Sequence, residues 1–153
     1  MIGLILTYMV VFFGLVIGVA LAYIAREELA TGRKHFIFLR DIIVTLAVLF
    51  LLYFYDLNRF VILFMTIIVF LTLINLRLDN DHVLYFFLSV ILMLTHKDTT
   101  FFEIESILVF LYGFPAGTLF AMKHKDVRII GKKLVRYAWF FAPLILLLFI
   151  SYQ

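Results

Sequence analysis

Apolar residues occur along the chain in six runs that are separated by short polar segments. A helix needs about 20 mostly apolar residues to cross the roughly 30 Å hydrocarbon core of a bilayer. The runs cover residues 2–24, 36–55, 60–76, 82–95, 101–122 and 137–152. Because they are continuous rather than alternating, they favour helices over the strands of a membrane barrel. The pattern predicts an all-α integral membrane protein with six transmembrane helices and short loops, of which the fourth is the shortest.

Composition supports this class. Of the 153 residues, 66% are hydrophobic and only 15% are charged, whereas soluble domains carry about 25% charged residues. At this length we expect one transmembrane domain over residues 1–153. The chain has no cysteine, which excludes disulfides, thiolate metal sites and cysteine nucleophiles. The first apolar run is longer than the core of a typical signal peptide and follows no basic residue, so we expect a retained helix.

The distribution of lysine and arginine predicts the orientation. With six spans, the connectors after the first, third and fifth helices share one side of the membrane. The opposite side receives only Arg59 and Lys97. The first side receives Arg26, Arg33, Lys34, Arg40, Arg77, Lys123, Lys125, Arg128, Lys132, Lys133 and Arg136. Since basic loops stay in the cytoplasm, we expect both termini to be extracytoplasmic, in a cytoplasmic (plasma) membrane.

The basic segment 123–136 has an amphipathic pattern. Val127, Ile130 and Leu134 recur at helical spacing, and the basic residues form a second stripe. This pattern indicates an interfacial helix on the anionic inner leaflet, where each basic residue contributes about 1 kcal/mol. The residues expected to contact these lipids are Lys125, Arg128, Lys132, Lys133 and Arg136. Topology accounts for their charge, so we expect no nucleic-acid partner.

Small residues indicate where helices approach closely. Gly14, Gly18 and Ala22 are spaced four apart in the first run, and Gly113 and Gly117 have the same spacing in the fifth. Helices in lipid associate through such residues. We therefore expect the first and fifth helices to make close contacts, with each other or with a second copy. The alternative is that glycine is simply frequent in membrane helices.

Two prolines interrupt helical hydrogen bonding. Pro115 frees the carbonyl four residues before it, and the hydroxyls of Tyr112 and Thr118 are nearby candidates to bind that carbonyl. Pro143 does the same to the carbonyl of Trp139 in the last run. We expect a kink in the fifth helix, which serves either packing or function.

The fifth run also carries the most prominent ionisable residue. Glu105 shares a helical face with Tyr112, seven residues later. This face is consistent with an outward-opening cleft that narrows to the kink, with Glu105 as a cation or proton site. The proposed pathway residues are Glu105, Tyr112, Gly113, Pro115 and Gly117. In the alternative interpretation, Glu105 lies in the headgroup zone near the helix N-terminus, which Thr99 or Thr100 caps, with Glu103 completing a capping box.

Charged residues also mark the cytoplasmic side. Arg40 and Asp41 enter the second helix there. Arg40 could form a buried network with a nearby carboxylate, but we favour a snorkelling side chain without a specific partner. The candidate carboxylates are Asp79, Asp81, Glu27, Glu28 and Asp126.

Histidine and aspartate provide a weak candidate for a metal site. His82 follows Asp79 and Asp81 closely, and both residue types bind divalent metals. No histidine pair has ligand spacing on one helix, so we expect no cofactor.

Three functions fit these observations. The first is a small transport or channel-type protein, a homo-oligomer or part of a larger membrane assembly, whose fifth helix lines the path. The second is a non-catalytic membrane subunit or assembly factor that docks a partner through its small-residue faces. The third is a lipid-modifying enzyme that acts at the cytoplasmic rim through Asp79, Asp81 and His82. The sequence favours a protein that is not an enzyme, because no nucleophile motif or phosphate-binding loop is present.

Overall fold

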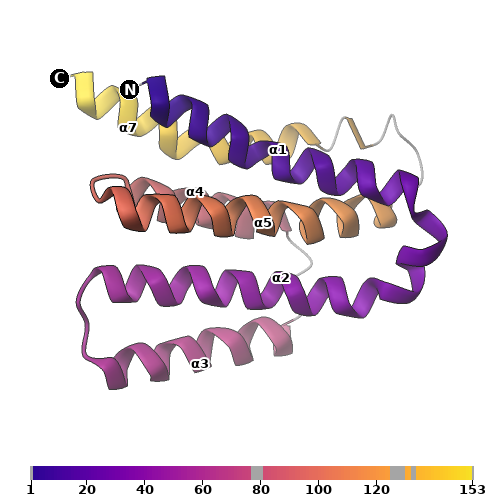
Figure 1. Cartoon of the computed structure of the whole chain (residues 1–153), viewed down its shortest axis with the longest axis horizontal. Helices are drawn as coiled ribbons and strands as arrows, with labels where there is room; N and C mark the ends of the chain where they lie inside the picture. Colours follow the sequence, from indigo (N-terminus) through magenta and orange to yellow (C-terminus); the bar gives the residue numbers. More distant parts are fainter. Residues whose placement is uncertain (1, 77–80, 125–129, 132–133, 153) are drawn as a thin grey trace.

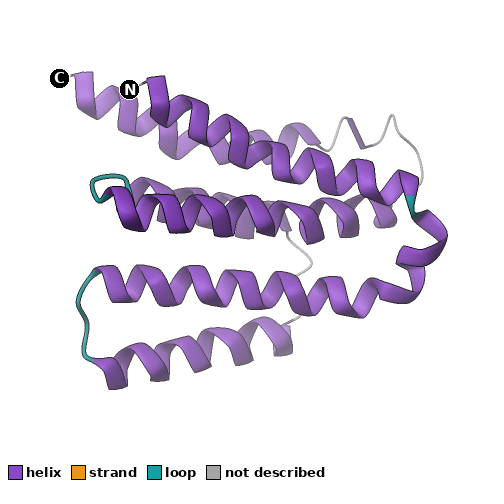
Figure 2. Ribbon diagram, in the orientation of Figure 1, coloured by secondary structure: helices purple, strands orange, loops and turns teal. Residues whose placement is uncertain are grey.

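The computed structural model describes residues 2–76, 81–124, 130–131 and 134–152, and this part of the chain is a bundle of helices joined by short turns (Figures 1 and 2). Its long elements are α1 (Ile2–Ile24), α2 (Arg26–Phe54), α3 (Arg59–Leu76), α4 (Asp81–Thr95) and α5 (Thr99–Lys123). A 3₁₀ segment, η1 (Val135–Phe141), then runs directly into α7 (Ala142–Tyr152). The predicted all-α class is confirmed.

Among the described residues, three helices are long and apolar enough to cross a membrane: α1, residues Gly32–Phe54 of α2, and α5. The other apolar helices are shorter. At 1.5 Å per residue, the 15 residues of α4 extend for about 22 Å, less than the hydrocarbon core. The structure therefore supports a membrane protein with three clear candidate spans.

Two helices differ from the lengths that hydropathy predicts. α2 begins at Arg26 rather than at Phe36, so the polar connector before the apolar run is helical. This connector contains Arg, Glu, Leu, Ala and Lys, which are strong helix formers. The last apolar run is divided between η1 and α7. An apolar run marks residues that face lipid or the protein core. A helix can extend past the ends of such a run, because its backbone hydrogen bonds do not require apolar side chains.

α5 is the central helix. It packs against α1, α2 and α4, whereas α3 packs mainly on α2, and η1 packs on α4 (Figure 1). Two thirds of the apolar window of α5 is buried inside the protein, compared with 28% of the window of α1. Residues on α5 are therefore surrounded mainly by other helices.

The chain ends and connections are sorted between the two ends of the bundle. Both termini lie at the same end as the α2–α3 and α4–α5 turns, and the α1–α2 junction lies at the opposite end with the C-terminus of α5 (Figure 1). Successive long helices are therefore antiparallel. This is the arrangement that alternating passes through a bilayer would produce.

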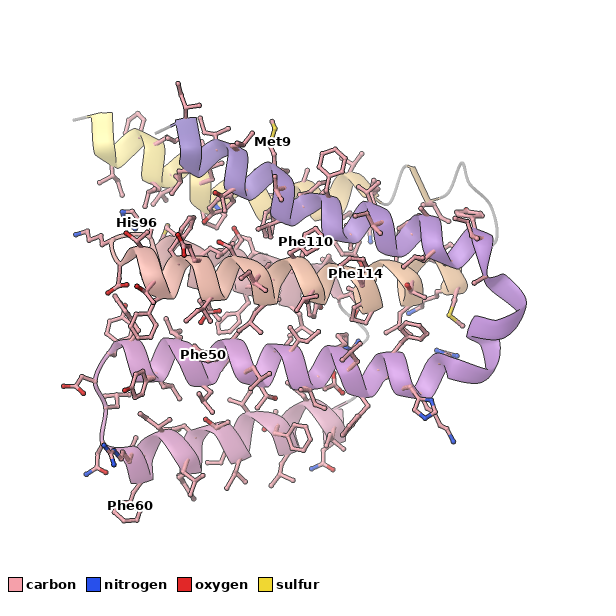
Figure 3. The ribbon with its side chains drawn as sticks, in the orientation of Figure 1. Met9, Phe50, Phe60, His96, Phe110 and Phe114 are labelled. Carbon is pink, nitrogen blue, oxygen red and sulfur yellow. The ribbon has the colours of Figure 1, made fainter. Side chains whose placement is uncertain are left out.

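α1 and α5 meet at backbone distance along their glycines. A Cβ atom on Gly14 would lie 2.2 Å from the carbonyl oxygen of Phe110, and one on Gly117 would lie 2.2 Å from that of Leu15. Cβ atoms on Gly18 and Gly113 would lie 2.4 Å from the facing backbone. Figure 3 shows Phe110 and Phe114 at this junction. The small-residue faces of the two helices thus pack against each other within one chain.

The third residue of the α1 stripe is also enclosed. Ala22 is 5% exposed, which places it with Gly14 and Gly18 on the buried face of α1. The hydroxyl of Thr118 on α5 donates to the carbonyl of Gly18 at 3.0 Å. Close approach and an interhelical hydrogen bond therefore act at the same place, as they do in many membrane helix pairs.

Candidate functional site

Glu105 is the outstanding polar residue of the bundle. Its side chain is 0% exposed, and neither carboxylate oxygen has a hydrogen-bond partner among the described residues. Glu103, two residues earlier, is exposed. Buried polar groups are nearly always hydrogen-bonded, and an isolated charge in an apolar interior is very costly. An unpartnered, enclosed carboxyl group is therefore a candidate functional group.

The helix start that precedes Glu105 differs from the prediction. Asp98, rather than Thr99 or Thr100, is the N-cap of α5, and its carboxylate accepts hydrogen bonds from the backbone N–H groups of Thr100 and Phe101. A capping box with Glu103 is therefore not formed. The protein itself encloses the Glu105 side chain.

The α5 face that carries Glu105 packs against α4 two turns further on. Tyr112 is fully buried, and its ring stacks on Tyr85 of α4 at 5.8 Å between centroids. Its hydroxyl donates to the backbone carbonyl of Asp81 at 3.5 Å. Residues seven apart share a helical face, so one buried stripe of α5 leads from Glu105 towards Asp81.

The structure places all five proposed pathway residues inside the bundle. Glu105, Tyr112, Gly113, Pro115 and Gly117 are buried. Gly113 and Gly117 pack directly against the backbone of α1. The outward-opening cleft expected along the face of Glu105 and Tyr112 is therefore not formed in this conformation, because helix packing closes that face.

An apolar groove lies between α1 and α5. Its volume is about 290 Å³, and none of the five pathway residues lines it. The lining residues are Leu6, Thr7, Val10, Val11, Ser106, Ile107 and Phe110. The groove thus borders the residue next to Glu105 without including Glu105 itself.

Pro115 is accommodated within a helix that is continuous from Thr99 to Lys123. The two hydroxyls predicted to bind the carbonyl that Pro115 frees have other acceptors. Tyr112 donates to Asp81, and Thr118 donates to Gly18. Both tie α5 to neighbouring helices, so their role is interhelical.

A second buried polar group joins α2 and α4. Arg40 is 4% exposed, and Asp41 is 3% exposed. The Nε and Nη2 atoms of Arg40 each lie 2.9 Å from Oδ1 of Asp41. Its Nη1 atom lies 2.6 Å from Oδ1 of Asp81. The preference for a snorkelling Arg40 is therefore wrong, and Asp81 is one of the candidate carboxylates that it binds.

A group of stacked aromatic rings is linked to Asp81 through the hydroxyl of Tyr112. Tyr85 of α4 stacks on Phe140 at 4.5 Å and meets Tyr137 edge-on at 6.0 Å. With Tyr112, these side chains bring α4, α5 and η1 together beside α2. We call Arg40, Asp41, Asp81, Tyr85, Tyr112 and Tyr137 the ionic–aromatic cluster. Of the two carboxylates that Arg40 binds, Asp41 lies on its own helix and Asp81 links α2 to α4.

The proposed metal ligands do not assemble into a site in the described part of the chain. There, no three histidine, aspartate or glutamate side chains are placed to hold a metal ion. His82 contacts the ring of Tyr137, and Asp81 pairs with Arg40. Asp79 lies outside the described residues.

Most of the predicted lipid-binding residues also lie outside the described residues, namely Lys125, Arg128, Lys132 and Lys133. Arg136 is exposed at the start of η1. Ile130, predicted on the apolar stripe of this segment, is 5% exposed. At this position the apolar stripe therefore contacts protein.

A hydrogen bond that the sequence did not suggest connects α4 to η1. Because η1 has 3₁₀ geometry, the carbonyl of Trp139 accepts a hydrogen bond from the N–H of Ala142. Pro143 therefore does not leave the Trp139 carbonyl without a donor. Pro143 instead lacks the N–H that a 3₁₀ helix would direct at the carbonyl of Phe140. The hydroxyl of Ser89 donates to that carbonyl. No local sequence pattern relates Ser89 to a carbonyl 51 residues later.

The fold and its two buried polar groups define an all-α protein with three helices able to cross a membrane and ionisable side chains inside the helical bundle. No protein-family model matches the chain, and comparisons with curated proteins and with solved structures found no match either. Its function must therefore be inferred from the buried groups themselves.

Proposed function

We propose that this chain is a small transport protein of the plasma membrane and that Glu105 on α5 binds the transported or coupling cation. The observation that carries the proposal is the complete burial of a carboxyl group whose two oxygens have no hydrogen-bond partner in the described structure. Such a group is costly to retain for stability alone. Ionisable residues inside membrane bundles commonly mark ion pathways.

The position of Glu105 supports this role. It lies in the second turn of the most enclosed helix, and the stripe that it shares with Tyr112 ends at the ionic–aromatic cluster. In the proposed topology the chain crosses the bilayer six times, with both termini extracytoplasmic. Glu105 is then near the outer side, and Arg40 is towards the cytoplasm. In this proposal the described conformation is a closed state, and the helices packed on α5 must move apart to expose Glu105.

The proposed partners are lipids and other membrane proteins. Anionic inner-leaflet lipids are expected to bind the basic segment 123–136, and a homo-oligomer or a membrane-protein partner remains part of the proposal. Docking through Gly14 and Gly18 receives less support, because these residues are occupied by α5. A rim enzyme receives less support as well, because Asp81 is engaged by Arg40.

The experiment is cation flux in proteoliposomes that contain the purified chain. Proton movement is followed with a pH-sensitive dye, and sodium and potassium movement with tracer ions. We expect the wild type to carry a cation and E105Q to lose flux by at least about tenfold, because the amide cannot carry the charge of a carboxylate. E103Q is the matched control, since Glu103 is exposed, and it should retain flux. Wild-type vesicles that match protein-free vesicles for all three ions would refute the proposal.

A further inference from the structure

We infer that the ion bound by Glu105 is a proton, held as a neutral carboxylic acid, and not a metal cation. This inference rests on the proposed transport function, because it names the ion that the same carboxyl group would bind. The carrying observation is that neither oxygen of the Glu105 carboxyl group has a hydrogen-bond partner among the described residues, and that no group of three histidine, aspartate or glutamate side chains there could hold a metal ion.

A metal cation needs a shell of ligands. Calcium takes six to eight oxygen atoms, and magnesium requires near-octahedral coordination. Both oxygens of Glu105 lack a hydrogen-bond partner in the described structure, and no group of three histidine, aspartate or glutamate side chains is placed there to hold an ion. A single carboxylate in an apolar setting cannot replace the hydration shell of such an ion.

The buried serine and threonine hydroxyl groups of the described helices are already used. The hydroxyls of Ser106 and Thr95 donate to carbonyls of their own helices. Ser89 and Thr118 donate to carbonyls of η1 and α1. None of these groups turns towards the Glu105 carboxyl. Recruiting them as metal ligands would break hydrogen bonds that hold the bundle together.

Among the described residues, the charged and titratable groups of the packed helices that are not exposed are engaged as well. α1 contributes no charged side chain to α5. The hydroxyls of Tyr8 and Tyr85 donate to carbonyls of α4 and α1. On α2 and α4, Arg40, Asp41 and Asp81 form the buried ion pairs. His82 contacts Tyr137, and His96 lies against the carbonyl of Met93.

A proton meets the requirements of this setting. It binds one carboxylate oxygen as an O–H bond, removes the negative charge and needs no further ligand. The remaining cost is that of an unpaired hydroxyl and carbonyl, which is far below that of an isolated carboxylate. When the helices open, the O–H bond breaks, the proton passes to water and the carboxylate is regenerated.

The first test is labelling by dicyclohexylcarbodiimide, an apolar reagent that reacts with neutral carboxylic acids. The acid adds across a C=N bond to give an O-acylisourea, which rearranges to a stable N-acylurea, so all atoms of both reactants are retained. The chain is labelled in liposomes and digested, and the peptides are measured by mass spectrometry. We expect labelling at Glu105 in the wild type and in E103Q, no labelling at this position in E105Q, and no protection by NaCl, KCl or CaCl₂ at constant pH.

The second test does not depend on reagent access. Infrared difference spectra between the wild type and E105Q should show a carboxylic acid band in the wild type that the same salts do not change. Protection from labelling by a salt, or an ionised carboxylate band assigned to Glu105, would overturn the inference. Salt protection together with cation flux would leave the transport proposal intact, whereas a neutral acid in a chain without flux would support the proton site and refute transport.

Discussion

Arg40 of α2 and Asp81 of α4 form a 2.6 Å ion pair inside the bundle, although 41 residues separate them in sequence. Arg40 simultaneously binds Asp41 on its own helix at 2.9 Å. The two carboxylates therefore differ in what they connect. Asp41 neutralises Arg40 within α2, and Asp81 ties α2 to α4. If α4 moves away during opening, Arg40 keeps a counterion.

This difference predicts unequal effects on stability. Arg40→Met should cost about 3–5 kcal/mol of unfolding free energy, because it leaves buried carboxylates without their cation. Asp81→Asn should cost less than half as much, because Arg40 keeps Asp41. Arg59→Met, at an exposed position, is the control. Unfolding in mixed micelles, followed by circular dichroism, measures all three. Equal losses for the Arg40 and Asp81 variants would contradict the unequal roles.

The positions of the helices could be predicted from the sequence. The partners of the buried charged residues could not be predicted from it. Continuous apolar runs mark segments that avoid water wherever they pack, so α1 and α5 begin and end close to the expected residues. The burial of Glu105 depends on which helices surround α5. The ion pair of Arg40 depends on a long-range approach of α4. Neither property is encoded in the local pattern around the residue.

The glycine contact between α1 and α5 predicts strong sensitivity to a single methyl group. Gly113→Ala and Gly117→Ala place a Cβ atom 2.4 and 2.2 Å from backbone atoms of Leu15. Backbone cannot rotate away as a side chain can, so the helices must separate. We expect losses of about 1–3 kcal/mol or more.

Gly3→Ala provides the matched control for these variants. Gly3 also lies in α1, but a Cβ atom there meets nothing within 4 Å. Alanine is the better helix former, so this variant should lose no stability. Chemical unfolding of the three variants in the same micelles makes the comparison. A loss in Gly3→Ala as large as that in Gly117→Ala would show that glycine acts through the helix backbone rather than through the α1–α5 contact.

The bond from Ser89 to the Phe140 carbonyl predicts an energetic link between Ser89 and Pro143. Ser89→Ala should cost about 1–3 kcal/mol, because it leaves a buried carbonyl without this donor. Pro143→Ala restores an N–H at the position that a 3₁₀ helix would use. The loss from Ser89→Ala should therefore be smaller when Pro143 is already alanine, which a double-mutant cycle measures.

Ser106→Ala is the control for Ser89→Ala. The Ser106 hydroxyl donates to a carbonyl of its own helix at 2.6 Å, so its loss leaves the contact between helices intact, and we expect a smaller effect. If the stability losses of Ser89→Ala and Pro143→Ala are strictly additive, the contribution of the Ser89 hydroxyl does not depend on Pro143. The prediction that Pro143 frees the carbonyl of Trp139 assumes α-helical spacing, whereas Val135–Phe141 form a 3₁₀ helix.

The proposed topology predicts opposite accessibility of the two ends of the bundle. Because the chain has no cysteine, single cysteines report their side without background. Leu57 is exposed in the α2–α3 turn, and Gly131 is exposed after the opposite end of α5. Ile130 is unsuitable because it is buried. On intact cells, a membrane-impermeant maleimide should label Leu57→Cys and should label Gly131→Cys only after permeabilisation. The reverse result would place both termini in the cytosol. Glu105 would then lie towards the cytosol, and the direction from which the carboxyl group takes its proton would be inverted.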